Sequence, residues 1–486
     1  MALNTTELIA HVHAFTPSVN RFAGQSEGDY ATQLRAAIIQ QALAHSPYAA
    51  LFIDLDDAYF VAVLSGFAEA VRKGEALHSE ALVRLAATAA ARSATPRTRD
   101  ILYESAQLLY AVLVHPTAQP VPALAEDIWQ TLTAILHTAD LPAPSDYWGD
   151  PRAQALRTMV AWARWRRTHD ANFGRPFDTL DELTGLEALT DSLAADLTVT
   201  VIGERFAQLT DLDHGWAERH IHLLTGTNPL ARLAWEAYLE ISPPYRPAID
   251  LLLDAYRAAA STRSEDGTDR QEHLRIKLGS DVLGRYWGGL IELDGEDSII
   301  RDYYANSSSE VLNRLAWNIA SDVSAASDIP DAVIERVRRW WEWRKTNLTG
   351  APAGPDSPER RELLEVPGAL VSSGRFPATW CIDQLHELLK TARSFGRNSR
   401  IFRYLTTVVE DHTGPVLNLV QQCLTSPSMD PWLPSLHEAD ISTLLRTGLQ
   451  TPEHAALSRD IINRAAARGY QQFRSLLAAQ PPAPTP

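Results

Sequence analysis

The stretch that decides the fold is DYATQLRAAIIQQALAH, residues 29–45, whose apolar side chains recur at helical rather than alternating spacing. Positions i, i+4, i+5 and i+9 fall on one face of an α-helix, and here they are occupied by Leu34, Ile38, Ile39 and Leu43. Residues 128–137, IWQTLTAILH, show a similar pattern. Only LTVTVIG, residues 197–203, has β-branched residues that could form a strand, and we expect a helix there because packing overrides weak propensity.

Capping residues followed by proline mark where several helices begin. We expect such starts at Asp150-Pro151, Asn228-Pro229, Ser357-Pro358 and Thr451-Pro452. A further start is expected at Ser308. Roughly twenty amphipathic runs of about 10 to 20 residues follow one another with short turns between them. Many short helices in series predict an all-α fold, a HEAT-like α-solenoid of stacked antiparallel helix pairs, although no strict sequence repeat is visible.

Turn-rich segments suggest how the chain is divided. Residues 261–272 are polar and charged and predict an exposed loop, whereas residues 348–360 are rich in proline and glycine and predict a linker. The predicted parts are an N-terminal helical segment at 1–145, helical-repeat regions at 146–347 and 361–478, and a disordered proline-rich tail at 479–486.

Composition excludes several classes of protein. The 486 residues are 45% hydrophobic and carry a formal net charge of −16, which suits a soluble core-forming chain and opposes non-specific binding to nucleic acid or anionic membrane. Two distant cysteines, Cys381 and Cys423, make no disulfide framework, so we expect a reducing cytoplasm. The N-terminus lacks the pattern of a secretory signal, and no apolar run is long enough to span a bilayer.

The stretch RVRRWWEWRKTN, residues 336–347, combines three tryptophans with five basic side chains. On a helix, Ile334, Val337, Trp341 and Arg344 share one face. We interpret the segment as a buried helix between repeats with a solvated basic face. The alternative is an aromatic and basic platform for nucleic acid.

Three acidic residues, Asp54, Asp56 and Asp57, form a D-x-D-D pattern in an apolar setting. A pattern of this kind supplies the proton donor in class II terpene cyclases, which keep a carboxylic acid protonated in an apolar cavity. Those cyclases also carry repeated Gln-Trp motifs, which this chain lacks. We therefore favour a helix start or a solvated face for these carboxylates.

Histidine and cysteine also fail to predict a reactive site. His220 and His222 stand two residues apart, as do His11 and His13, so each pair diverges on a helix and cannot chelate one metal ion. Asp211, Asp213 and His214 lie near the first pair in the sequence, and Glu7 with His11 offers only two ligands. A metal site needs three or four converging ligands, so we predict none here. Cys381, five residues before His386, is expected to pack beside Trp380 rather than to act as a nucleophile.

Basic residues gather at 152–167 and 336–345, with a weaker group at 390–403. If stacking brought them onto one face, they would form a positive stripe for nucleic acid. That hypothesis predicts salt-sensitive binding weakened by Arg338→Glu or Arg166→Glu.

Longer segments carry a resemblance to a known family. They include DPRAQALRTMVAWARW at 150–165, PLARLAWEAYLEISPPYRPAIDLLLDAYRAAA at 229–260 and ELLEVPGALVSSGRFPATWCIDQLHELLKTA at 362–392. In this order they resemble the C-terminal HEAT-like helical region of large bacterial P-loop NTPases of the antiphage-defence type, over about residues 145–478. The resemblance implies a region that senses a trigger or scaffolds an assembly.

One departure from that family is large. No G-x-x-x-x-G-K-[ST] occurs, so no phosphate-binding loop is present, and we expect a detached or truncated C-terminal module or a subunit of a split system.

The sequence thus predicts a non-catalytic recognition or scaffold module, with no catalytic, cofactor-binding or metal-ligating residue. Its expected partner is a protein, either an NTPase or effector subunit or a phage protein. An all-helical enzyme and a nucleic-acid-binding solenoid remain the alternatives.

Overall fold

The computed structural model describes residues 3–15, 26–92, 95–138, 149–169, 173–184, 192–263, 268–295, 298–349, 357–392, 395, 399–426 and 431–478. Within these ranges every regular element is an α-helix or a short 3-10 helix and none is a strand, so the all-α prediction is confirmed. The chain divides into a first unit, Met1–Ala255, and a second unit, Tyr256–Pro486. The finer division into 1–145, 146–347 and 361–478 stays a prediction, and the tail at 479–486 lies outside the described residues.

The helices of the first unit follow in chain order. They are α1 (Thr5–Ala14), α2 (Glu27–Gln40), α3 (Ala42–His45), η1 (Ser46–Asp54), α4 (Asp57–Arg72), α5 (Ser79–Ala90), α6 (Thr98–Val114), η2 (Pro122–Leu124), α7 (Ala125–Leu136), α8 (Pro151–Arg167), α9 (Arg175–Thr184), α10 (Ser192–Leu212), α11 (His214–His220), α12 (His222–Thr225), α13 (Pro229–Ile241) and α14 (Arg246–Leu251). Helix α15 (Leu253–Ser261) spans the boundary between the units.

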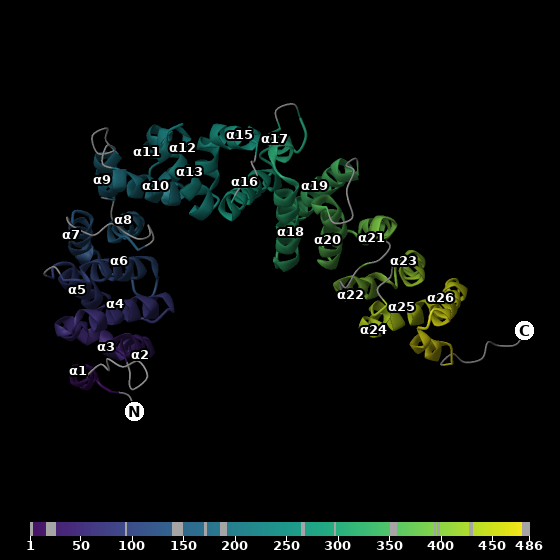
Figure 1. Ribbon diagram of the computed structural model, residues 1–486, viewed down its shortest axis with the longest axis horizontal. Coiled ribbons are helices and arrows are strands. Elements are labelled where there is room, and N and C mark those ends of the chain that lie inside the picture. The colour runs from purple at the N-terminus through teal and green to yellow at the C-terminus, as the bar shows by residue number, and fades with distance from the viewer. Residues whose placement is uncertain are drawn as a thin grey trace, which may run out of the picture. The chain divides into compact units, whose positions relative to one another are not determined.

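Helices of the first unit pack in two rows. In one row α2, α4, α6, α8, α10 and α13 each contact the next, and in the other η1, α5 and α7 do the same. Figure 1 shows α4, α6 and α8 following one another in this order. Helix α4 has row neighbours on two sides and α8 packs on α6, α7 and α10, which explains why both bury apolar side chains around most of their circumference.

The second unit repeats this mode of packing. Its helices are α16 (Asp269–Trp287), α17 (Ile299–Asn306), α18 (Ser309–Ala325), α19 (Asp331–Thr349), α20 (Pro358–Ser372), α21 (Ala378–Ala392), α22 (Ser399–Val408), α23 (Thr413–Thr425), α24 (Leu433–Leu436), α25 (Glu438–Gln450), α26 (Ala455–Ala467), η4 (Gln471–Arg474) and α27 (Ser475–Ala478). Helices α16, α18, α20, α22 and α25 contact one another in succession. A second series of contacts joins α21 to α23 and α23 to α26.

Most predicted helix starts are confirmed. The side chains of Asp150, Asn228, Ser308 and Ser357 each accept a backbone N–H from the first turn of the helix that follows. The prediction at Thr451 is wrong, because this residue ends α25 and the next helix begins at Ala455. Residues 269–272 belong to α16 and 358–360 to α20, so the predicted loop and linker are both shorter than expected.

Residues 29–45, whose spacing predicted the fold, are helical, but they form two helices and not one. The backbone of Gln41 leaves the helical region, so α2 ends at Gln40 and a separate short helix, α3, begins at Ala42. Leu34 and Ile38 are buried as expected, whereas Leu43 is 54% exposed and Ala42 and His45 point inward instead. Residues 128–136 bury the predicted face, and residues 197–203 lie within α10, as expected.

The tryptophan-rich stretch lies in α19 and is held in the core, as predicted. Trp340 and Trp341 have no exposed surface. The indole nitrogen of Trp340 donates to the hydroxyl of Tyr304 in α17 at 2.8 Å, and that of Trp341 donates to the side-chain oxygen of Gln384 in α21 at 3.1 Å. Three neighbours therefore fix this helix, since the Arg344 side chain also reaches α20.

Candidate functional site

A cavity of about 310 Å³ opens in the first unit where α6, α8 and α10 meet. Its lining residues come from these three helices and from the chain that follows α6 and α8: Tyr110, Leu113, Val114, Gln119, Arg157, Ala161, Arg164, Trp165, Arg167, Thr168, Arg205 and Gln208. Four of them are arginines and none is acidic. An arginine-lined cavity in a chain with a net charge of −16 is the most distinctive polar feature among the described residues.

One face of α8 supplies much of the lining. Arg157, Ala161, Arg164, Trp165 and Thr168 stand at i, i+4, i+7, i+8 and i+11, which is the spacing of a single helix face. The helix starts firmly, because Asp150 caps it by accepting from the Arg152 amide at 2.8 Å and Pro151 occupies its first position.

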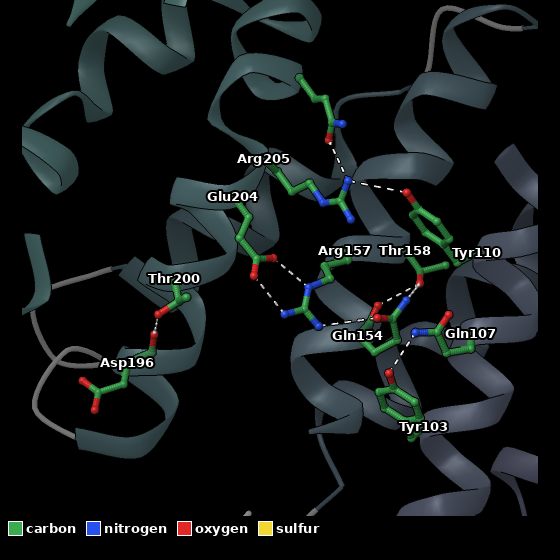
Figure 2. Close-up of polar contacts among 11 residues, drawn as sticks. Tyr103, Gln107, Tyr110, Gln154, Arg157, Thr158, Asp196, Thr200, Glu204 and Arg205 are labelled. Atoms are coloured by element: carbon green, nitrogen blue, oxygen red, sulfur yellow. Dashed lines mark hydrogen bonds and ion pairs between the residues drawn. The ribbon is translucent and has the colours of Figure 1, made fainter. Parts of the chain in front are cut away.

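A buried ion pair joins α8 to α10 beside the cavity. Arg157 donates from Nε and Nη2 to the two carboxylate oxygens of Glu204, at 2.7 and 3.1 Å, and both side chains are buried (Figure 2). Gln154, one turn earlier, accepts from Nη1 of Arg157 at 3.4 Å. Removing one member of such a pair costs about 3–5 kcal/mol because the other charge stays buried alone. The pair therefore holds the two helices in register.

The arginine that follows Glu204 turns the other way, toward α6. Nη1 of Arg205 lies 3.5 Å from the Tyr110 hydroxyl (Figure 2). The same atom donates to the side-chain oxygen of Gln208 at 3.3 Å. Its guanidinium carbon lies 5.5 Å from the centre of the Tyr110 ring, within the range of a cation–π contact. Arg205 makes no ion pair within the part of the chain that the structure describes.

Two donors of the lining are buried without a hydrogen-bond partner among the described residues. They are Nε1 of Trp165, a side chain only 3% exposed, and Nε of Arg205. A buried donor left unpaired costs on the order of 1–3 kcal/mol. Both belong to residues that line the same cavity.

The remaining arginines lie at the C-terminal end of α8. Arg167 is half-exposed and pairs with Asp211, its Nη2 lying 2.5 Å from a carboxylate oxygen. Arg164 is exposed and makes no ion pair in the described ranges. Among the described residues, four guanidinium groups therefore face two partner carboxylates, Glu204 and Asp211, which leaves two positive charges unbalanced.

The Asp54, Asp56 and Asp57 side chains do not enclose an acid site. Asp54 and Asp56 are exposed, at the end of η1 and the start of α4, and Asp57 is half-buried 3.5 Å from Nη2 of Arg92. A protonated catalytic acid needs an apolar enclosure, which exposed carboxylates do not have. These residues match the helix start and solvated face that we favoured.

The predicted histidine groups engage in packing and capping. The His220 ring stacks on Trp216 with centres 4.3 Å apart, and its Nε2 lies 3.1 Å from Asp181. Asp213 caps α11, and Asp211 pairs with Arg167. His11 and His13 are exposed on α1, where Glu7 completes a capping box. Across the described ranges, no three His, Cys, Asp or Glu side chains are grouped so as to hold a metal ion.

Both cysteine thiols are buried, and neither is activated as a nucleophile. Burial raises the pKa of Cys381 to about 11 and that of Cys423 to about 12. Cys381 Sγ lies 3.7 Å from the carbonyl oxygen of Phe376, whereas the ring of His386 lies near Gln422. The thiol and the imidazole thus have separate partners, in line with the packing role expected for this cysteine.

Basic residues of 336–345 pair with glutamates of the same helix. Arg338 and Arg339 both pair with Glu335, at 2.7 and 3.1 Å, and Lys345 pairs with Glu342 at 2.9 Å. Of the three basic groups, that at 152–167 alone lines the cavity described above. The basic group predicted from the sequence includes Arg157 and Arg164 but not Tyr110 or Arg205. These two residues lie in other helices, and only the packing of those helices brings them to the cavity.

Among the described residues, no helix combines the length and the apolar character needed to cross a membrane. No protein-family model, curated protein or solved structure matches this chain.

Proposed function

We propose that the chain is a non-catalytic α-solenoid that recognises a protein partner. The observation that carries this proposal is the two-row packing of each unit, in which helices mainly contact helices close to them in the chain. Stacked helix pairs of this kind offer extended surfaces for recognition, and they need no central reactive site to do so. HEAT-like repeats of antiparallel pairs are the arrangement that best fits these contacts.

Exposed apolar side chains support a protein partner. Leu43, Tyr48 and Leu51 are exposed within nine residues of α3 and η1. At the other end of the chain, Trp432 is 69% exposed and Leu436 lies one helical turn further on, also exposed. Large aromatic and aliphatic side chains of this kind are typical anchors of protein interfaces.

Truncation tests the solenoid. In a stack whose units contact only their neighbours, removing the last units leaves the others folded. A chain ending at residue 426, which lacks α24 to α27, should keep its ellipticity at 222 nm per remaining residue within about a tenth of that of the full chain. Deletion of the internal helix α18 is the control, and it should lower the ellipticity per residue far more than the terminal truncation does. A general collapse of helicity in the terminal truncation, measured on its monomeric fraction, would contradict the repeat architecture.

The partner is tested by affinity capture from infected and uninfected bacterial cells, followed by crosslink mapping. We expect one protein whose crosslinks fall on more than one helix pair, and weaker capture by Trp432→Ala or by Tyr48→Ala. Val121→Ala, which shortens an exposed side chain elsewhere, is the matched control. Equal capture by all three variants would remove these side chains from the proposed interface.

On the resemblance of residues 145–478 to the helical regions of antiphage NTPases, we further propose that this module acts as the sensor part of a bacterial defence system in the cytoplasm. Its partner would then be an NTPase or effector subunit, or a phage protein. Deleting the gene should raise the plaquing efficiency of at least one phage, and Tyr48→Ala or Trp432→Ala should reproduce the effect. Unchanged plaquing across a broad phage panel would contradict the defence role.

The two other candidate functions have weaker support. An acid catalyst at Asp54, Asp56 and Asp57 would need an apolar enclosure, whereas two of these side chains are exposed. Nucleic-acid binding through residues 336–345 would need free cations, whereas three of them pair with nearby glutamates.

A further inference from the structure

We propose that the arginine-lined cavity between α6, α8 and α10 binds a small phosphate monoester. This site is independent of the surface through which the module would bind a protein. Four arginines line the cavity without any acidic lining residue. Two of their charges are balanced by Glu204 and Asp211, and the other two belong to Arg164 and Arg205. A dianionic phosphate group would balance both.

The unpaired donors point to the same kind of ligand. Nε1 of Trp165 is buried in a lining side chain and has no hydrogen-bond partner among the described residues, and the same holds for Nε of Arg205. Both groups can only donate, so they call for an acceptor and not for a cation or an amide N–H. A phosphate presents three terminal oxygens, and arginine binds them through two parallel N–H groups.

Helix electrostatics alone explains only part of this cluster. Cations in the last turn of a helix are favoured by its dipole, which accounts for Arg164 and Arg167 at the end of α8. Arg205 lies inside α10 and not in its last turn, and it is directed toward Tyr110 of α6 (Figure 2). The cluster therefore combines side chains from separate helices at one cavity, as a binding site does.

The size and walls of the cavity limit the rest of the ligand. About 310 Å³ lies at the lower end of the range for small-molecule pockets. Leu113, Val114 and the ring of Tyr110 form an apolar wall beside the arginines. A monoester with a small ring or short carbon skeleton fits both features, with its phosphate at the arginines and its carbon part at this wall.

Titration calorimetry of the full chain tests the proposal with three probes, at about 150 mM salt to suppress non-specific attraction. Phenyl phosphate should bind more tightly than inorganic phosphate, because its ring reaches the apolar wall. Benzoate, with one charge and fewer acceptor oxygens, should bind at least about tenfold more weakly than phenyl phosphate. Equal binding of benzoate and phenyl phosphate, or no heat with phenyl phosphate at about 10 mM, would overturn the proposal.

Variants locate the binding. Arg205→Gln and Arg164→Gln should each weaken phenyl phosphate binding by about tenfold or more, since each removes a charge-assisted hydrogen bond. Arg84→Gln, on the exposed face of α5, changes the net charge equally and is the control. Arg164 is exposed, so its variant should fold even if that of Arg205 does not. Equal weakening in the Arg84 and Arg164 variants would show diffuse attraction and overturn the site.

A further binding experiment distinguishes a small-molecule ligand from the phosphorylated end of a nucleic acid. A short 5′-phosphorylated oligonucleotide should bind no more tightly than phenyl phosphate, because the other two cavity arginines, Arg157 and Arg167, already pair with Glu204 and Asp211. Markedly tighter binding of the oligonucleotide, lost without its 5′-phosphate, would overturn the small-molecule proposal in favour of nucleic-acid ends.

Discussion

Arg344 in α19 donates from Nε and Nη2 to the two carboxylate oxygens of Glu362 in α20, both at 2.8 Å, and both side chains are buried. The Arg344 guanidinium also lies over the Tyr304 ring, with 5.1 Å between its carbon and the ring centre. The pair thus ties the tryptophan-rich helix to the helix that follows it and lies in the same core as Trp340.

Loss of one member should therefore destabilise this region strongly. Glu362→Ala leaves the Arg344 charge buried and unpaired, and we expect a loss of about 3–5 kcal/mol. Replacing both residues by apolar ones, Arg344→Met with Glu362→Leu, should recover much of this loss. Hydrogen exchange in peptides from α19 and α20 measures the effect locally, which suits an array that can unfold in steps. The exposed pair of Arg84 and Glu80 is the control, and a Glu362→Ala effect no larger than that of Glu80→Ala would contradict the expectation.

Gly203 should resist replacement although it lies inside a helix. A Cβ there would meet the carbonyl oxygen of Ala234 at 2.0 Å, because α10 and α13 approach closely at this point. Gly284 of α16 is also helical but has open space around it. Gly284→Ala should stabilise the chain by about 0.5–1 kcal/mol through helix propensity, whereas Gly203→Ala should destabilise it. Urea unfolding of both variants checks the pair, and stabilisation by Gly203→Ala would show that the two helices separate at little cost.

Asp281 should make the stability of the second unit depend on pH. Its carboxylate accepts the Tyr256 hydroxyl at 2.7 Å, and burial raises the pKa of the group from 3.8 to about 6. The folded state therefore holds this proton more tightly than the unfolded state does. The stabilisation from Asp281 is complete below about pH 4 and is lost as the pH rises through about 6.

Asp281→Asn keeps an acceptor for Tyr256 and removes the titration. The variant should gain on the order of 1–2 kcal/mol of unfolding free energy relative to the unsubstituted chain between about pH 4 and 7. Thermal or urea unfolding across this range measures the difference. Asp294→Asn, at an exposed turn, should show no such trend. A difference that shrinks with rising pH would contradict the raised pKa.

The thiols of Cys381 and Cys423 should react very slowly with thiol reagents in the folded protein. Burial raises the pKa values of Cys381 and Cys423 to about 11 and 12, so the thiolate is rare and inaccessible at neutral pH. At about pH 8, a disulfide reagent should react with the native chain at least about a hundredfold more slowly than with the chain in denaturant, where both cysteines react. Ser280→Cys places a thiol on an exposed position of α16 and is the positive control. Rapid labelling of the unsubstituted chain would contradict this prediction, because it would show that the helices around Cys381 or Cys423 separate readily.

Helix positions followed from local patterns, because capping and i, i+4 contacts involve residues close in the chain. Asp150, Asn228 and Ser357 cap helices as predicted. The error at Thr451 has a local cause as well: its hydroxyl donates to the carbonyl of Thr447 in the helix before it, and the helix after it starts four residues later, at Ala455. Leu43 could not be placed, since the helix is interrupted at Gln41 and the apolar spacing of α2 does not continue into α3, where Leu43 is exposed.

The candidate site was visible in sequence only in part. The spacing of Arg157, Ala161, Arg164 and Trp165 marks one face of α8, and that signal was available within the basic group at 152–167. Nothing local pairs Arg157 with Glu204, which lies 47 positions away, or directs Arg205 toward Tyr110, 95 positions away. Such contacts depend on which helices become neighbours.

By itself, the sequence determined that this chain is helical throughout its described parts, where most helices begin, and that Trp340 and Trp341 are buried. Each of these follows from the periodicity and chemistry of a few adjacent residues. Only the tertiary structure decided which buried charges meet, as for Arg344 with Glu362, and where arginines from two helices face one cavity. The physical reason is that hydrogen bonding and apolar spacing within a helix are local, whereas the partner of a buried charge is set by the packing of whole helices.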